Sequence, residues 1–154
     1  MDLNHSSFFA VGSEMNEYVN EPLKNQLCKI ESIAILYNNE PLVNRFGNKI
    51  AKITFKIVKG EHLNKISVQE FNTEVTTGSD GKEHMPRLLR YLVLNTGYSV
   101  EAEAGKKIIP EKWYDEIIGK KVIVNFKQSQ GGYVSVLNTQ SEMTTIGGVR
   151  FYYR

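Results

Sequence analysis

The sequence predicts a mainly β protein with a short helical insertion. Apolar and polar residues alternate with period two over most of the chain, which is the pattern of half-buried strands. Between residues 86 and 119 the spacing changes to the three- and four-residue period of amphipathic helices. The 154 residues, of which 41% are hydrophobic, are enough to bury one core.

Residues 1–22 are expected to form an extended arm. They contain four acidic residues and no Lys or Arg, whereas the rest of the chain holds all 19 basic residues and 13 of the 17 acidic ones. A basic body favours an anionic partner, although mild basicity is also ordinary. Phe8, Phe9 and Val11 form an apolar cluster that a solvated tail rarely carries. We predict that these three residues mediate oligomerisation by docking on a neighbouring copy; packing on their own domain is the alternative.

Three strands are expected next, over Leu27–Tyr37, Lys49–Val58 and Asn64–Val75. The first should be buried on both faces in its second half, because both odd- and even-numbered positions there carry apolar residues. In the second, Lys52 and Lys56 fall on a positively charged outer face. The opposite, core-facing set of this strand is Ala51, Ile53, Phe55 and Ile57.

Two helices are expected between residues 86 and 119. Pro86 and Gly97 delimit the first, and Pro110 and Gly119 delimit the second, because proline favours helix starts and glycine favours helix ends. The apolar stripe of the first helix is Leu88, Leu89, Leu92 and Val93.

Two more strands, Lys121–Lys127 and Tyr133–Asn138, are expected around a Gly131-Gly132 hairpin turn. Three strands, a helical insertion and two strands is the order of an OB-fold, a five-stranded, partly open barrel. We therefore predict an OB-fold domain over residues 23–140. Residues 141–154 are expected to form a C-terminal tail or an extra edge strand.

The chain also resembles a family. The segments Ile53–Gly60, Lys65–Asn72 and Ile118–Val122, with the glycine hairpin that leads to Asn138, are similar to OB-fold single-stranded DNA-binding proteins of bacteriophages and of conjugative plasmids of Gram-positive bacteria. The resemblance implies a protein that coats single strands during DNA replication, recombination or conjugation. Many bacterial relatives end in an acidic tail, whereas this chain ends in Arg154.

Single-strand binding needs cations for phosphates and flat side chains for bases. An OB-fold offers both on its second and third strands and on the loops between strands one and two and between strands four and five. The predicted stacking residues are Tyr37, Phe46, Phe71 and Tyr133, each of which could instead belong to the core. The predicted phosphate contacts are Arg45, Lys49, Lys52, Lys56 and Lys127. Gln69 is placed beside Phe71 on the outer face of the third strand. Arg87 and Arg90 either extend the basic track or form a solvated helix face.

Signals of catalysis are weak. His5, His62 and His84 are scattered without metal-ligand spacing, and no phosphate-binding loop motif occurs. Cys28 lies in an apolar strand, where a structural thiol is the expectation. We therefore predict a non-enzyme that needs no cofactor and no metal.

The predicted partner is single-stranded DNA, with RNA as an open alternative. No apolar run approaches the roughly 20 residues of a membrane helix, and no secretory signal begins the sequence, so a cytoplasmic protein without membrane contact is expected. The rival hypothesis is a protein–protein interaction module of a phage, plasmid or secretion assembly. Solvent exposure of Lys52, Lys56 and Phe71 on one surface would favour the nucleic-acid hypothesis.

Overall fold

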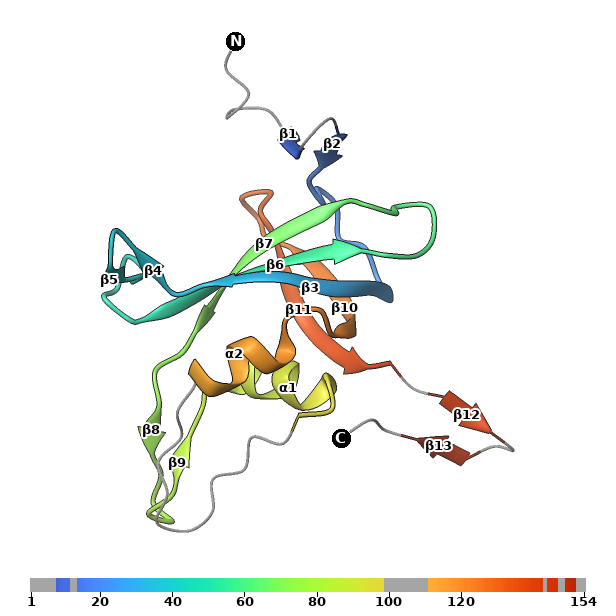
Figure 1. The fold of residues 1–154 in the computed structure, drawn as a ribbon. Helices are drawn as coiled ribbons and strands as arrows, with labels where there is room; N and C mark the ends of the chain where they lie inside the picture. Colours follow the sequence, from blue (N-terminus) through green and yellow to red (C-terminus); the bar gives the residue numbers. More distant parts are fainter. Residues whose placement is uncertain (1–7, 12–13, 99–110, 143, 147–148, 152–154) are drawn as a thin grey trace.

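The computed structural model describes residues 8–11, 14–98, 111–142, 144–146 and 149–151 (Figure 1). Its main body is a five-stranded antiparallel sheet in the order β11-β10-β3-β6-β7. The bounds of these strands are Gln26–Ala34 for β3, Ile50–Ile57 for β6, Ile66–Asn72 for β7, Lys121–Gln128 for β10 and Val134–Ser141 for β11. The mainly β class predicted from the sequence is confirmed.

The sheet is open, with β11 and β7 as its edges, so it is not a closed barrel. One side chain joins the two edges. Gln69 on β7 donates from Nε2 to Val134 O of β11 at 3.3 Å, and its Oε1 accepts from Val136 N at 3.3 Å. The amide of Gln69 thus supplies two hydrogen bonds between edge strands that are not paired with each other in the sheet.

The central strand β3 is shorter than predicted. It ends at Ala34, and the chain then forms a hairpin of β4 (Leu36–Tyr37) and β5 (Glu40–Pro41). The turn residues Asn38 and Asn39 have φ of +50° and +64°, a left-handed pair typical of two-residue hairpin turns. The prediction that the second half of this strand is buried on both faces is wrong, because Ser32 and Ala34 are exposed.

Two helices lie under one face of the sheet (Figure 1). The helix α1 spans Arg87–Asn95 and α2 spans Glu111–Ile117, close to the predicted bounds. Pro86 occupies the position just before α1, and Gly97 follows the end of the helix with φ of +96°, a conformation that only glycine adopts easily. A small hairpin of β8 (Thr76–Thr77) and β9 (Glu83–His84) connects β7 to α1.

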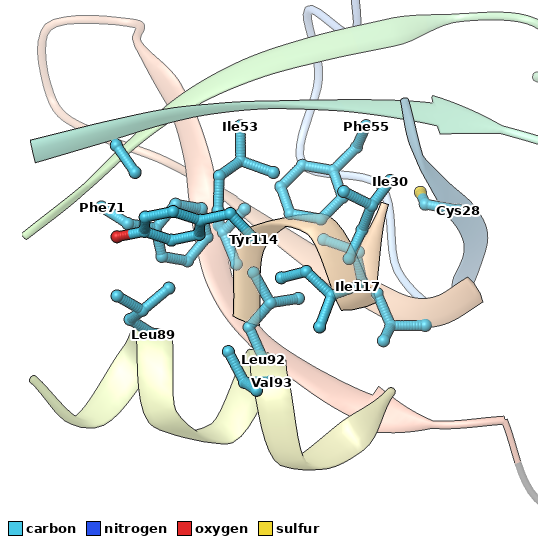
Figure 2. Close-up of a cluster of buried hydrophobic side chains, with 14 of the residues drawn as sticks. Cys28, Ile30, Ile53, Phe55, Phe71, Leu89, Leu92, Val93, Tyr114 and Ile117 are labelled. Carbon is cyan, nitrogen blue, oxygen red and sulfur yellow. The ribbon is translucent and has the colours of Figure 1, made fainter. Parts of the chain in front are cut away.

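The core fills the space between the sheet and the helices (Figure 2). The inner face of β6 contributes Ile53 and Phe55, as predicted, and α1 buries Leu89, Leu92 and Val93 completely. The ring centroids of Phe55 and Phe71 are 6.0 Å apart at an interplanar angle of 54°, the tilted arrangement that aromatic pairs prefer.

The N-terminal residues form a separate hairpin of β1 (Phe8–Val11) and β2 (Glu14–Glu17). The chain then joins the main body earlier than expected. Val19 N donates to Ile66 O at 2.7 Å, and the side chains of Val19 and Leu23 are part of the core. The described side chains do not include those of Phe8, Phe9 and Val11, so oligomerisation through them stays a prediction.

At the C-terminal end, β12 (Thr144–Ile146) and β13 (Val149–Phe151) pair with each other in a two-stranded sheet of their own. They therefore form a hairpin beyond β11 rather than an added strand of the main sheet. Neither of the helices described above has the length and apolar character needed to span a membrane.

Candidate nucleic-acid interface

A row of lysines crosses the outer face of the sheet. The register places Lys121 of β10 opposite Lys29 of β3, and Lys29 opposite Lys56 of β6. Directly opposed residues of antiparallel strands point to the same face, so the three lysine side chains share the outer face of the sheet. Only Lys29 has a described ion pair, to Glu31 at 3.3 Å. Like charges opposed across strands destabilise a sheet, so an anionic ligand would relieve this row.

A second row of the same face is more mixed. Lys52 of β6 is exposed and lies opposite Glu70 of β7 and Ala34 of β3. Between the two rows, Thr54 and the exposed Val68 are paired across the strands. The outer face therefore carries Lys52 and Lys56, as the alternation predicted, together with one acid near Lys52.

The loop after β5 displays an exposed ring beside a cation. The guanidinium carbon of Arg45 lies 4.8 Å from the ring centroid of Phe46, and Phe46 is 74% exposed. Asn44 Oδ1 accepts from Phe46 N at 2.9 Å and from Asn48 N at 3.0 Å, which fixes the loop backbone. A fixed loop with an uncovered aromatic face suits base stacking, because little conformational entropy is lost on binding.

Two neighbouring residues of this loop are exposed as well. Tyr37 on β4 is 71% exposed. Lys49, just before β6, has an exposed side chain, while its backbone N–H donates to Glu74 Oε1 at 2.9 Å. The β4–β5 hairpin, from which this loop continues to β6, lies at one end of the sheet (Figure 1).

The turn between β10 and β11 presents a third exposed ring. Tyr133 is 79% exposed, and its N–H donates to Ser129 Oγ at 3.1 Å. Gly132 adopts φ of +84°, which allows the tight turn. Lys127, at the stem of this turn, is exposed as predicted.

Two predicted site residues occupy other positions. Phe71 is 2% exposed and packs on Phe55, so it cannot act as a stacking surface. Gln69 is partly buried and bridges β7 to β11. The error has one cause: the alternation in β7 was assigned to the wrong face. Its inner face is the set Ser67, Gln69 and Phe71, which the register places opposite inner residues of β6.

Sequence reasoning missed Lys29 and Lys121. Lys29 does alternate with the buried Cys28 and Ile30, which signals an outward side chain. Its alignment with Lys56 and Lys121 depends on strand pairing, which the sequence pattern alone does not specify.

The chemistry of the described residues is one of binding surfaces. Burial raises the pKa of the Cys28 thiol from 9.0 to about 12, so this thiol stays protonated. Among the residues placed by the structure, no cluster of three or more His, Cys, Asp or Glu side chains could hold a metal ion. Comparison with protein-family models gives no match, and comparison with curated proteins gives none either.

Proposed function

We propose that the protein is a non-catalytic single-stranded DNA-binding protein with little sequence preference. The observation that carries the proposal is the cross-strand row Lys121–Lys29–Lys56 on the outer face of a sheet whose loops carry exposed rings. Phosphates would bind the ammonium groups, and bases would stack on Tyr37, Phe46 and Tyr133. Each stacked base contributes about 1–3 kcal/mol regardless of its identity, which explains the expected sequence tolerance.

The fold that we propose is of the OB type. The sheet has its first strand, β3, at the centre, and the helices fall between the third and fourth strands of the sheet. The Gln69 bridge between the edge strands is consistent with a partly open barrel. In such a fold the lysine rows and both loops belong to the binding surface.

The acidic N-terminal segment would act between copies. Phe8, Phe9 and Val11 would dock on an adjacent protomer and make binding cooperative along the strand. The four acids of residues 1–22 complement the basic body of a neighbour.

A protein-interaction module remains the second candidate. It is favoured by the apolar side chains around the β4–β5 hairpin, where Leu36 and Val43 are exposed next to Tyr37. A protein partner would bury these aliphatic groups, whereas a nucleic acid would use mainly the rings and cations.

Variants of the interface separate the two candidates. Tyr37→Ala, Phe46→Ala and Tyr133→Ala should each weaken binding to labelled oligo-dT about fivefold or more in fluorescence anisotropy, because each removes a stacking surface. Leu63→Ala, at an exposed apolar position in the loop between β6 and β7, is the matched control and should leave affinity unchanged. Equal affinities for all four variants would contradict the assigned surface.

A further inference from the structure

A groove lies between α1 and β11, away from the lysine rows. It has a volume of about 700 Å³. Residues of α1 form one wall and β11 forms the other, with Lys127 of β10 at its margin. The lining residues that matter for the argument are Arg87, Tyr91, Lys127, Leu137, Asn138 and Gln140.

The groove has one sign of charge. Arg87 and Lys127 line it, and none of its lining residues is Asp or Glu. Two cations without a carboxylate in a concave surface favour an anionic occupant.

The groove also offers a partly exposed aromatic ring. The guanidinium carbon of Arg87 lies 5.5 Å from the ring centroid of Tyr91, and Tyr91 is 42% exposed. Tyr91 and the Arg45–Phe46 pair are therefore built alike, each an exposed ring with a guanidinium over it. Such a pair offers a base both stacking and charge.

Two of the β11 residues that line the groove carry amide side chains. Asn138 Oδ1 accepts from Asn125 Nδ2 at 2.8 Å, which fixes the side chain of Asn138 and leaves its own Nδ2 as a donor. Gln140, two residues along β11, is exposed. Amide groups of this kind hydrogen-bond base edges and phosphates without selecting one base.

The groove is continuous with the interface proposed above. Lys127 belongs to both: it lines the groove, and it is paired with Ser135, two residues beyond Tyr133. A DNA strand that stacks on Tyr133 can therefore enter the groove at Lys127. It meets no acidic residue there, because none lines the groove.

We propose that the groove between α1 and β11 binds the segment of single-stranded DNA that continues past the β10–β11 turn. This inference rests on the proposed function and adds a second subsite to it. The sheet face and loops hold one part of the strand, and Arg87 with Tyr91 holds the next.

The test measures affinity against length. Labelled oligo-dT is extended stepwise from about 4 to about 30 nucleotides, a range that spans the site sizes of OB-folds. Native mass spectrometry restricts the comparison to complexes with one protein per oligonucleotide. The wild-type affinity should rise once at short lengths and again, by about tenfold, when the strand reaches the groove.

The double variant Arg87→Ala, Tyr91→Ala should remove the second rise and leave affinity for the shortest bound oligonucleotide unchanged. Both side chains are exposed, and circular dichroism with thermal unfolding verifies the fold of the variant. Lys112→Ala is the control, because it removes an exposed cation from α2 outside the groove.

Four outcomes would overturn the inference. If the wild type binds short oligo-dT but shows no second rise, or if the double variant keeps it, the subsite is wrong while the proposed function stands. If the double variant changes self-association and not the length dependence, the groove serves an acidic segment of another copy instead. If the wild type binds no oligonucleotide, the proposed function itself fails.

Discussion

The aromatic side chains divide into two groups with different roles. Phe55 and Phe71 stabilise the core from neighbouring strands, whereas Tyr37, Phe46 and Tyr133 are uncovered at the loops. Burial decides which substitutions report on stability and which report on binding.

Phe71→Ala should lower the free energy of unfolding by about 3–5 kcal/mol, because it removes a buried ring and leaves a cavity. Tyr133→Ala should change it by less than about 0.5 kcal/mol, since the side chain is exposed. Urea denaturation monitored by circular dichroism measures both. A midpoint for Phe71→Ala equal to that of the wild type would contradict the described core.

Cys28 should be unreactive in the folded protein. Burial raises the pKa of its thiol to about 12, so the reactive thiolate is scarce at pH 8. Labelling with a thiol-specific disulfide reagent should be slow in buffer and complete in denaturant.

The same shift has a consequence for stability. The unfolded thiol ionises near its ordinary pKa of 9.0, while the folded thiol remains neutral. The contribution of the neutral, buried thiol to the free energy of unfolding is therefore fully present below pH 9 and is lost as the pH rises from 9 toward 12. Cys28→Ala should make the free energy of unfolding fall less steeply over this pH range. If the variant loses stability as steeply as the wild type, groups other than Cys28 cause the loss.

At the scale of elements, the lysine row couples sheet stability to ligand binding. Lys56→Gln removes one of three adjacent like charges, so at low salt it should raise the free energy of unfolding slightly, by about 0.2–1 kcal/mol. It should also reduce the slope of log affinity against log salt by about one, as expected for one lost phosphate contact.

Lys59→Gln is the matched control for this prediction, because Lys59 is exposed in the turn after β6 and lies outside the row. The two variants are compared by thermal unfolding and by oligo-dT titration at several salt concentrations. Equal salt slopes for Lys56→Gln and the wild type would remove Lys56 from the phosphate path.

The elements differ in how far the sequence could predict them. The faces of β6 and the bounds of α1 followed from periodicity, since Ala51 to Ile57 alternate strictly and Pro86 and Gly97 delimit the helix. The inner face of β7 did not follow from periodicity. Ile66 and Val68 alternate with the set Ser67, Gln69 and Phe71, and either set could face the core. Ile66 is buried although it lies opposite Lys56, and its backbone O accepts from Val19 N, a tertiary contact that no local pattern carries. For the same reason, the alignment of Lys29 with Lys56 and Lys121 emerged only with the register.

In the molecule as a whole, Val19 is the first core residue among the side chains that the structure describes, four residues before the predicted domain start at residue 23. A truncation that tests the N-terminal segment should therefore remove residues 1–17 and keep Tyr18 onward. We expect this variant to unfold at the wild-type temperature and to lose self-association and cooperative binding.

Light scattering after size exclusion measures self-association, and the Hill slope on long oligo-dT measures cooperative binding. A full truncation of residues 1–22 is the informative comparison, because it also removes Val19 and should lower stability. An unchanged mass and an unchanged binding curve for the shorter truncation would exclude the segment from oligomerisation.

The central claim is that the charged face and exposed rings bind single strands. The most direct measurement is fluorescence anisotropy of the wild-type protein with labelled oligo-dT and with a duplex of equal length, at low and moderate salt. We expect clearly tighter binding to the single strand, because only unpaired bases can stack on Tyr37, Phe46 and Tyr133, and we expect a steep loss of affinity with salt. Equal affinity for the duplex, or no binding to either at low salt, would contradict it.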